Sequence, residues 1–267
     1  MKDTTTLFPH ETLNLGEINL YHPEGTFTPS SASHIALRAI AGNQSLLAGA
    51  GIDWGTGSGC LAILAARIPA VEEVIGLDIS ESSIQVARRN AQTNSVDNKV
   101  RFMVSDSYQP FADAQRRTLD TFRGRTDFLL SNPPFSDDDD GFNYRRVVLR
   151  GAKDFLRTEG VVFLNVAYHY GAERIARLTT DVPGYAAGGV LATTAWVPYD
   201  LSLPDYLHYL KNYAVEEEKG GSEYYFKHHE SPHSVLNARA ALGVFRETGK
   251  SPLTMWQSHL YVRQTDP

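Results

Sequence analysis

The sequence is poor in cysteine, in long apolar runs and in basic residues. Its 267 residues include one cysteine, Cys60, which excludes an intramolecular disulfide framework and fits a reducing compartment. Residues 1–8 contain no apolar signal region, and no stretch approaches the ~18 apolar residues that a membrane helix needs. The formal net charge of −6 argues against a general affinity for polyanions. We therefore expect a cytoplasmic protein that binds no membrane and has no general affinity for nucleic acid.

The most informative stretch is the glycine-rich turn Gly55-Thr-Gly-Ser-Gly59. An apolar stretch precedes it and apolar residues at helical spacing follow it, so the predicted order is strand, turn, helix. Gly55, Gly57 and Gly59 permit positive φ angles, and they let a ligand approach the backbone where a Cβ would collide. The turn therefore predicts a ligand site, with a tight turn that binds nothing as the alternative.

Two carboxylates flank this turn in the sequence. Asp53 lies two residues before the first glycine, and Asp78 ends a second buried stretch, residues 74–78. In nucleoside-binding folds an acidic residue at such a strand end accepts hydrogen bonds from ribose hydroxyls. The dinucleotide fingerprint G-x-G-x-x-G is not matched, because its third glycine would fall at Cys60, and Asp53 would lie awkwardly beside a pyrophosphate. A cationic ligand fits better, although a nicotinamide or flavin site stays open as an alternative.

Buried strands alternate with helices along most of the chain. This spacing indicates right-handed βαβ units and an open parallel sheet. Residues 1–31 are predicted to form a short hairpin around Gly16, and residues 109–125 a loose helix or loop. We expect strands near residues 50–54, 74–78, 100–104, 127–132 and 160–166, and helices near residues 32–40, 60–67, 80–93 and 141–157.

The C-terminal third departs from this alternation. Strands are predicted at residues 189–197 and 255–262, with two helices between them. Ser202 is expected to cap the first of these helices and Ser231 the second, and Gly249 follows the end of the second. This segment is therefore predicted to be an insertion between the last two strands of the sheet.

The strand predicted at residues 127–132 ends in Asn132-Pro-Pro-Phe135. Strands of open α/β sheets present ligand-binding groups at their carboxyl ends. Pro133 and Pro134 fix φ and remove two donors, so carbonyl oxygens there remain free to accept hydrogen bonds. The Asn132 side-chain oxygen and the Pro133 carbonyl could hold both hydrogens of a planar amino group, with Phe135 against its face. A proline-rich strand exit without a binding role is the alternative.

Four other features receive structural interpretations. The acidic run at residues 137–140 is predicted to be a solvated turn, with a site for a cationic substrate as the alternative. The tyrosine-rich C-terminal segment is predicted to pack in the core. His228, His229 and His233 lack a nearby cysteine or aspartate, so no metal site is expected. Basic residues spread around the helix at residues 141–157 and predict a solvated surface: Arg145, Arg146, Arg150, Lys153 and Arg157.

The two main motifs together resemble those of a known enzyme family. The glycine turn is similar to motif I of class I S-adenosylmethionine-dependent methyltransferases. Residues 132–135 are similar to motif IV of amino-methyltransferases, which act on adenine, cytosine or glutamine nitrogens. From residue 51 to about residue 166 the chain resembles the glutamine N5-methyltransferases that modify polypeptide release factors. The similar stretches are residues 53–60, 76–80, 87–91, 100–102, 132–135 and 140–146.

The resemblance implies a fold. This fold is α/β, with a Rossmann-like seven-stranded, mostly parallel sheet, helices on both faces and an antiparallel last strand. Residues 1–267 would form a single methyltransferase domain with an N-terminal extension or lid (1–45), a cofactor-binding core (46–182) and C-terminal strands (183–267). The helical insertion at residues 198–254 would leave from the carboxyl edge of the sheet and cover the cleft as a substrate cap.

The resemblance also implies a cofactor, S-adenosylmethionine, and no metal. The residues that would bind the cofactor are Asp53, Gly55, Thr56, Gly57, Gly59, Asp78, Ile79, Ser105, Asp106 and Asn132. The residues that would hold the acceptor nitrogen are Asn132, Pro133, Pro134 and Phe135.

The implied reaction is N-methylation of an amide or amino nitrogen in a protein, a peptide or a small molecule. The chain lacks the family's helical N-terminal domain and its long loop after residues 132–135, and residues 183–267 have no counterpart, so we expect a different substrate apparatus. An adenine amino group in nucleic acid is the alternative acceptor, which the net charge places last. More distant alternatives are a nucleotide-cofactor oxidoreductase and a non-catalytic binder, and the oligomeric state stays open.

Overall fold

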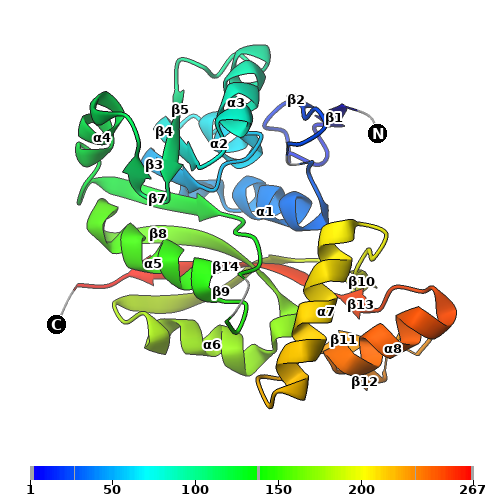
Figure 1. Cartoon of the computed structure of the whole chain (residues 1–267). Coiled ribbons are helices and arrows are strands. Elements are labelled where there is room, and N and C mark those ends of the chain that lie inside the picture. The colour runs from blue at the N-terminus through cyan, green and yellow to red at the C-terminus, as the bar shows by residue number, and fades with distance from the viewer. Residues whose placement is uncertain (1–2, 27, 137–138, 232, 266–267) are drawn as a thin grey trace.

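The computed structural model describes residues 3–26, 28–136, 139–231 and 233–265. Its centre is a twisted sheet (Figure 1). The strands are β3 (Gly49–Trp54), β4 (Val71–Asp78), β5 (Val100–Asp106), β6 (Gln109–Pro110), β7 (Thr126–Ser131), β8 (Leu156–Ala167), β9 (Tyr185–Thr193) and β14 (Trp256–Arg263). They lie side by side in the order β6-β5-β4-β3-β7-β8-β14-β9. Apart from the two-residue β6, this is the seven-stranded sheet that the sequence predicts.

The strand directions also follow the prediction. Strands β5, β4, β3, β7 and β8 run parallel, and β14 is antiparallel to both of its neighbours, β8 and β9. Successive residues of the central strands alternate between two apolar clusters: Leu129 and Val162 belong to one, Phe128 and Val161 to the other. The central strands are therefore buried on both faces, which explains why they appear in the sequence as nearly continuous apolar runs.

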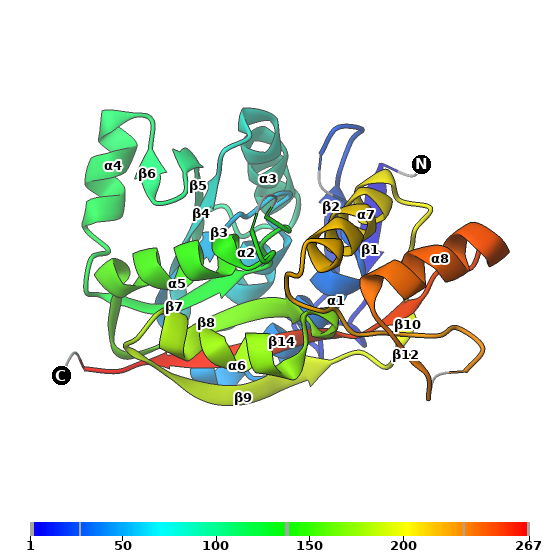
Figure 2. The same cartoon turned by 60° about the horizontal axis from the view of Figure 1, so that its bottom comes forward.

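Helices supply the cover on each face (Figure 2). Helices α1 (Ser31–Gly42), α2 (Cys60–Ala66) and α3 (Glu81–Thr93) contribute to one apolar cluster, and α4 (Asp113–Asp120), α5 (Asn143–Phe155) and α6 (Ala172–Asp181) to the other. There are also two short 3-10 helices: η1 (Gln44–Leu46), which has no buried residue, and η2 (Tyr168–Tyr170), which contributes Tyr170 to the core. Helix α6 is absent from the predicted elements, and α4 is a regular helix within the expected loose segment. No helix among the described residues is both long and apolar enough to cross a bilayer.

The predicted N-terminal hairpin is confirmed, with different bounds. Strands β1 (Thr4–Leu7) and β2 (Ile18–Tyr21) pair antiparallel, and Gly16 lies inside the long connection between them. Two amide side chains, one in α3 and one at its C-cap, accept hydrogen bonds from β2: Asn90 from the Tyr21 N–H at 2.8 Å and Asn94 from the Asn19 N–H at 2.9 Å. These two side chains thus form the backbone hydrogen bonds that a second neighbouring strand would otherwise form with β2.

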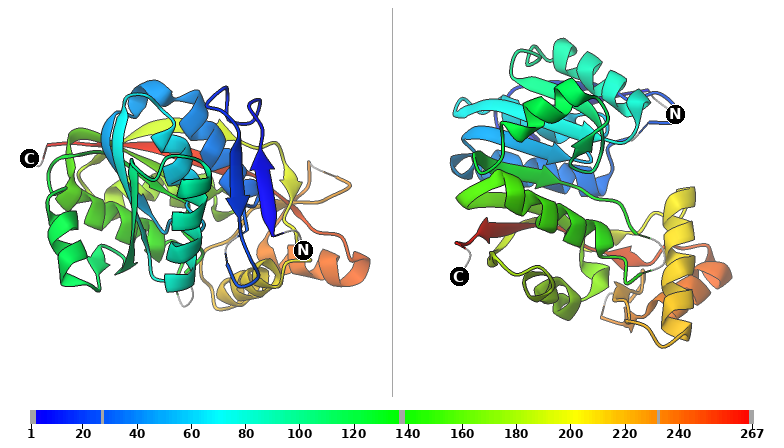
Figure 3. Two further views of the ribbon diagram at one scale, coloured as in Figure 1. Left: turned by 90° about the horizontal axis from the view of Figure 1, so that it is seen from above. Right: turned by 60° about the vertical axis from the view of Figure 1, so that its left-hand side comes forward.

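The C-terminal third adds a lobe beside one end of the main sheet (Figure 3). It contains helices α7 (Pro204–Glu218) and α8 (Ala238–Thr248) and a small sheet of β10 (Val197–Pro198), β11 (Phe226–Lys227), β12 (Val235–Leu236) and β13 (Leu253–Thr254). Strand β10 pairs with β13, so the chain enters and leaves the lobe at the same place.

Two predicted boundaries near the start of this lobe are wrong. Strand β9 ends at Thr193, and residues 197–198 belong to the small sheet instead. Helix α7 begins after Leu203, and the Ser202 hydroxyl donates a hydrogen bond to Asp200 rather than capping the helix. The aspartate two residues before Ser202 competes successfully for that hydroxyl.

The predicted start of the second helix is also wrong. Helix α8 begins after Asn237, whose side chain accepts a hydrogen bond from the Ala240 N–H at 2.9 Å, whereas Ser231 lies in irregular backbone before it. Asparagine and serine are both good N-caps, so propensity alone does not distinguish the two positions. Gly249 ends α8 with φ +68°, as predicted.

The buried carboxylate of Glu217 fastens α8 to α7. It accepts hydrogen bonds from the backbone N–H groups of Tyr224 at 2.9 Å, Ala238 at 2.9 Å and Arg239 at 3.0 Å. Ala238 and Arg239 lie in the first turn of α8, where N–H groups lack intrahelical partners and a negative charge is favourable. One side chain therefore supplies acceptors that the helix itself cannot provide.

We expect Glu217→Ala to lower the free energy of unfolding by at least about 2 kcal/mol, because buried donors left without an acceptor cost about 1–3 kcal/mol each. Glu218 is exposed, so Glu218→Ala should change this free energy by no more than about 0.5 kcal/mol. Urea unfolding followed by circular dichroism measures both variants. Equal stabilities would show that Glu217 does not anchor α8.

Candidate active site

A cavity of about 660 Å³ opens at the carboxyl ends of the parallel strands. Its glycine-turn end lies over β5, β4 and β3 and is formed by Gly55, Thr56, Gly57, Asp78, Ile79, Ser105 and Asp106. Its aromatic end lies toward β8, β14 and the C-terminal lobe and is formed by Phe135, His169, Tyr170, Tyr199, Tyr206, Tyr209, Tyr213 and Trp256. Asn132, Pro133 and Pro134 also line the cavity and follow β7, the strand between β3 and β8. The order of the strands therefore places them between the two ends.

The glycine turn is docked against β4 and open toward the cavity. The N–H groups of Gly55 and Thr56 each donate to the Leu77 carbonyl at 2.9 Å. Gly55 has φ +69°, and a Cβ there would meet no atom within 4 Å, so its backbone is accessible to a ligand. A Cβ on Gly59, with φ +86°, would lie 3.0 Å from the Phe102 ring. Gly59 is absent from the cavity lining and is required for packing.

Asp53 lies underneath the turn, outside the cavity lining. It is 0% exposed, and its Oδ2 accepts hydrogen bonds from the Thr56 hydroxyl at 2.6 Å and from the Ala62 N–H at 3.1 Å. Its Oδ1 has no partner among the described residues, and burial raises its pKa to about 7. Burial, with Asp53 close by, likewise raises the pKa of the Cys60 thiol to about 12, so this cysteine stays protonated. Asp53 therefore connects the turn to the first residues of α2.

Asp78 is the carboxylate that faces the cavity. Its Oδ2 accepts a hydrogen bond from the Gly57 N–H at 2.8 Å and its Oδ1 accepts one from the Ser80 N–H at 2.9 Å. Ile79, the next residue, is 67% exposed at the cavity rim. Asp106 occupies the corresponding position at the end of β5. Carboxylate oxygens have further lone pairs, so Asp78 can accept a ligand hydroxyl without releasing the turn.

The Asn132 amide is held in place by a buried asparagine, Asn165. Asn165 donates from its Nδ2 to the Asn132 Oδ1 at 3.1 Å and also to the Ala32 carbonyl at 2.5 Å. Asn165 lies on β8, beside the strand that Asn132 ends. An amide oxygen has two lone pairs, so Asn132 Oδ1 keeps one for a ligand N–H.

Arg145 lies beneath the two prolines, which corrects two predictions. Its Nη2 donates to the Pro133 carbonyl at 3.2 Å and its Nη1 to the Pro134 carbonyl at 3.1 Å, so these oxygens are not free. Arg145 is 4% exposed rather than solvated, and its guanidinium lies 5.2 Å from the centre of the Tyr170 ring. Two prolines in a row leave carbonyl oxygens without local donors, and a guanidinium from the next helix supplies them.

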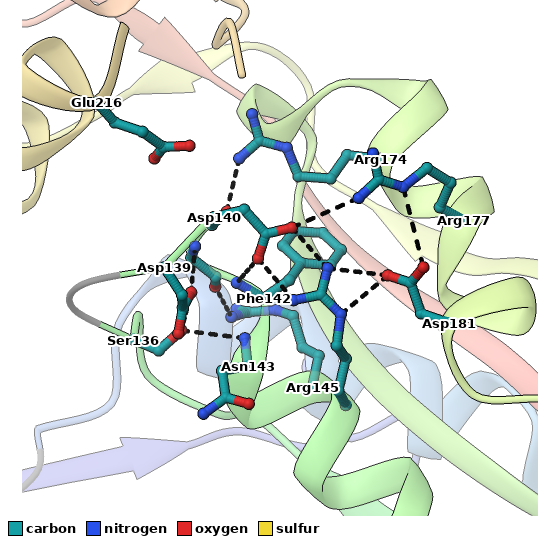
Figure 4. A network of polar contacts seen from close by, with 12 residues as sticks. Ser136, Asp139, Asp140, Phe142, Asn143, Arg145, Arg174, Arg177, Asp181 and Glu216 are labelled. Atoms are coloured by element: carbon teal, nitrogen blue, oxygen red, sulfur yellow. Dashed lines mark hydrogen bonds and ion pairs between the residues drawn. The ribbon is translucent and has the colours of Figure 1, made fainter. Parts of the chain in front are cut away.

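A network of ion pairs ties the loop after these prolines to α5 and α6 (Figure 4). Asp140 accepts hydrogen bonds from two nitrogens of Arg146, at 2.6 and 2.5 Å, and Arg146 also donates to Asp181 at 2.9 Å. Burial opposes ionisation, yet Arg146 holds the pKa of the Asp140 carboxyl below its ordinary value. The Arg146 side chain is only 14% exposed, so its predicted solvation is also wrong.

The described part of the acidic run at residues 137–140 is anchored rather than solvated. Asp139 accepts a hydrogen bond from the Ser136 hydroxyl at 2.8 Å, and Asp140 belongs to the network with Arg146. Asp137 and Asp138 lie outside the described residues. Asp139 and Asp140 therefore hold the loop between β7 and α5 in shape.

His169 is a cavity residue that the sequence reasoning missed. It lies just beyond the carboxyl end of β8, and that position is the signal that could have identified it. Its Nδ1 lies 2.8 Å from the Thr254 hydroxyl, and its Nε2 has no partner among the residues described. Burial, reinforced by the charges of Arg145 and Arg174, holds its pKa well below the ordinary value, so the ring is neutral at pH 7.

Residues of the predicted insertion line the cavity. Tyr206, Tyr209 and Tyr213 of α7 line the same cavity as Asn132, and Ser30, from the N-terminal segment, lines it as well. The prediction that the tyrosines pack in the core is correct for Tyr199, Tyr213 and Tyr224, which are all buried. Tyr206 and Tyr209 are partly exposed at the cavity.

A sequence model of one family, described as the methyltransferase small domain, matches residues 28–182. The chain is 43% identical over 86 residues to a release factor glutamine methyltransferase of Chlorobaculum tepidum, a match that covers 32% of this chain and 26% of that protein. It is 25% identical over 157 residues to a release factor glutamine methyltransferase of Thermodesulfovibrio yellowstonii, with 53% of this chain and 56% of that protein covered. These matches therefore span about a quarter and a little over half of the relatives' own lengths.

The solved structures support the fold. The crystal structure of a methyltransferase from Pyrococcus furiosus superposes with a TM-score of 0.52 at 13% sequence identity, covering 92% of this chain and 89% of that one. At this level of identity the likeness concerns the arrangement of strands and helices alone.

We expect Asp53→Asn to weaken the pH dependence of stability. Asp53 has an unfolded pKa of 3.8 and a folded pKa of about 7, so the folded state binds the proton more tightly. This group therefore destabilises the wild type progressively as the pH rises from about 4 to about 7, by about 4 kcal/mol in total. Urea unfolding at several pH values should show that the free energy of unfolding of Asp53→Asn increases relative to that of the wild type as the pH rises through this window. If the stabilities of the two proteins changed in parallel with pH, the pKa of Asp53 would not be raised by burial.

Proposed function

The chain belongs to the methyltransferase small domain family, and from this premise we propose that it is an S-adenosylmethionine-dependent N-methyltransferase. One observation carries the proposal: the glycine turn and Asn132 line the same cavity at one edge of the sheet. A methyl donor held by the turn and a planar nitrogen held by Asn132 would therefore meet inside that cavity.

The glycine-turn end fits S-adenosylmethionine better than a dinucleotide. Its lining residues include the carboxylates Asp78 and Asp106 and neither lysine nor arginine, so a pyrophosphate would find no cationic partner there. S-adenosylmethionine carries a sulfonium and an amino group but no phosphate, which agrees with this charge. The proposal is that Asp78 accepts hydrogen bonds from the ribose, that Asp106 lies near the adenine and that Gly55 leaves room for the ligand.

The remaining cofactor residues of the proposal fall into two groups. Asp53 and Gly59 lie away from the cavity and would act by shaping the turn. The others would contact the cofactor from the cavity wall: Thr56, Gly57, Ile79, Ser105 and Asn132.

S-adenosylmethionine, when bound, supplies a methyl group on a positively charged sulfur that is already activated toward a nitrogen. The residues of the chain would orient the acceptor: the Asn132 Oδ1 and the Pro133 carbonyl would accept its N–H bonds, and Phe135 would lie against its plane. Accepting these bonds favours the positive charge that develops on the nitrogen. Orientation and exclusion of water contribute up to ~7–11 kcal/mol in well-aligned reactions.

Arg145 would hold the backbone that carries Asn132 and the Pro133 carbonyl in position, rather than contact the substrate. The Pro133 carbonyl already accepts a hydrogen bond from Arg145 at 3.2 Å and keeps one lone pair for the acceptor nitrogen. Because Arg145 also holds the Pro134 carbonyl, the Asn-Pro-Pro backbone would stay in one conformation through the reaction.

The acceptor we propose is an amide or amino nitrogen of a protein, a peptide or a small molecule. The names of the two relatives favour a glutamine amide, whereas the insertion at residues 198–254 favours a different acceptor, for which it would form a cap. An adenine amino group in nucleic acid is the weaker candidate, because the net charge is −6 and the single arginine of the cavity lining is buried under the prolines. Residues 1–267 would then act as one domain, with 1–45 as an N-terminal extension, 46–182 as the cofactor-binding core and 183–267 carrying the cap. The lone cysteine agrees with the expected cytoplasmic location.

Calorimetry should show that S-adenosylmethionine binds the wild type and binds Asp78→Asn at least about tenfold more weakly, because a charged acceptor for the ribose is lost. Asp97 is exposed and lies outside the cavity lining, so Asp97→Asn is the matched control and should bind normally. Binding of NADH without binding of S-adenosylhomocysteine would overturn the cofactor assignment and favour an oxidoreductase.

A radiolabelled methyl donor offered to cell lysate, with the label fractionated into protein, nucleic acid and small molecules, would identify the acceptor. On that acceptor we expect Asn132→Ala to lower turnover by a factor on the order of 10²–10³, by analogy with the loss of one preorganised polar contact. Asn98→Ala, at an exposed position, should leave turnover unchanged. Normal turnover of Asn132→Ala would remove Asn132 from the mechanism, and label chiefly in RNA or DNA would reverse the order of acceptors.

A further inference from the structure

The aromatic end of the cavity presents flat apolar surfaces. Tyr199 and Tyr206 stack with ring centroids 4.8 Å apart, and Tyr206 lies 5.9 Å from Trp256. Phe135, three residues after Asn132, lies 5.1 Å from Tyr209. Aromatic rings in such arrangements bind a further planar ring through offset or edge contacts. The walls of this end therefore favour an aromatic ligand over an aliphatic one.

At this end lies one deeply buried polar atom whose hydrogen-bonding capacity the described residues leave unused. His169 is 1% exposed, and its ring is fixed by the contact between Nδ1 and Thr254, whereas Nε2 has no partner among the described residues. A buried nitrogen without a partner is unfavourable, and a ligand polar group would satisfy it. In either tautomer of the neutral ring, Nε2 offers one hydrogen bond.

The charges around His169 disfavour a cationic ligand. Arg145 and Arg174 both oppose protonation of the ring, after the larger effect of burial. Arg145 donates to three backbone carbonyls and, among the residues that the structure describes, forms no ion pair with a carboxylate. A cation bound at Nε2 would meet the same repulsion from an uncompensated guanidinium.

The depth of this end favours a molecule that enters whole. Tyr170, Tyr199 and Tyr213 are each no more than 2% exposed, although they line the cavity. The whole cavity measures about 660 Å³, within the usual range of about 300–1,000 Å³ for small-molecule pockets. Once the cofactor occupies the glycine-turn end, the remaining space suits a ring-sized molecule.

We propose that the aromatic end binds a small aromatic molecule that carries no positive charge and forms a hydrogen bond with His169 Nε2. The inference rests on the proposed function in one respect: this molecule would be the methyl acceptor, with its amide or amino nitrogen at Asn132 and its ring among the tyrosines of α7. His169 would then determine which acceptor is bound.

Ligand-observed NMR titrations of the full chain, in the presence of S-adenosylhomocysteine, test this with three small-molecule probes. Benzamide is planar and neutral, benzylamine is aromatic and cationic, and propionamide is neutral and aliphatic. Benzamide should bind at least about tenfold more tightly than the other two. A fourth probe, N-acetylglutamine methylamide, stands for a protein side chain and should bind no better than propionamide.

Two variants separate the polar contact from the packing. His169→Phe keeps a ring but removes Nε2, and it should weaken benzamide binding about tenfold, as expected for one lost hydrogen bond. Thr254→Val removes the same contact with Nδ1 while Nε2 remains, so it should weaken benzamide binding clearly less than His169→Phe does. If His169→Phe does not fold, Tyr206→Leu, at a partly exposed wall residue, should lower benzamide affinity and leave propionamide affinity unchanged.

The outcomes distinguish this inference from the proposed function. Binding of S-adenosylhomocysteine with no preference for benzamide, or an equal loss in both His169→Phe and Thr254→Val, would overturn the aromatic acceptor site and leave the methyltransferase proposal intact. Tighter binding of the glutamine probe than of benzamide would overturn it in favour of a protein acceptor. Absence of S-adenosylhomocysteine binding in the wild type would instead contradict the proposed function.

Discussion

Five parallel strands that end along one edge determine where the polar chemistry of this molecule lies. The central strands are buried on both faces, so polar side chains are disfavoured in their middle and collect where the strands end. The glycine turn follows β3, Asp78 ends β4, Asp106 ends β5 and Asn132 follows β7. Each strand contributes only one or two such residues, and the parallel register brings them to a single cavity.

Strand and helix ends also leave backbone groups without partners, and buried charged side chains form hydrogen bonds with several of these groups. Asp53 accepts the Ala62 N–H in α2, Arg145 donates to the carbonyls of Pro133 and Pro134, and Glu217 accepts N–H groups at the start of α8. None of these contacts neutralises the charge, because a backbone group carries only a dipole. Glu217 also forms an ion pair with Arg239 at 3.7 Å, whereas Asp53 and Arg145 form none among the described residues. Burial therefore raises the pKa of Asp53, and the charge of Arg145 acts on His169.

The sequence predicts well the features that depend on neighbours in the chain. The apolar periods identify the strands of the sheet, and the glycine turn and Asn132 mark two strand ends correctly. It predicts poorly the features that depend on remote partners. The sequence predicts that Arg145 lies on the surface, because the carbonyls that it contacts belong to another part of the chain. His169 is fixed by Thr254, which is 85 residues away. The predicted start of α8 is wrong for the same reason. Acceptors for its first N–H groups come from Glu217, a residue of α7, and not from the expected cap Ser231.

The C-terminal lobe is the part of the chain in which the proposed acceptor site could vary while the strand ends remain the same. The family match covers residues 28–182, and the lobe lies outside it. Because β10 pairs with β13, changes within the lobe need not move β9 or β14. The lobe is nevertheless coupled to the core at the cavity: the Tyr213 hydroxyl lies 3.2 Å from that of Tyr170, and Thr254 holds His169. We therefore expect substitutions on the cavity face of α7 to shift η2, and through it His169, so that the proposed acceptor preference would depend on the contact between lobe and core as well as on the residues that touch the acceptor.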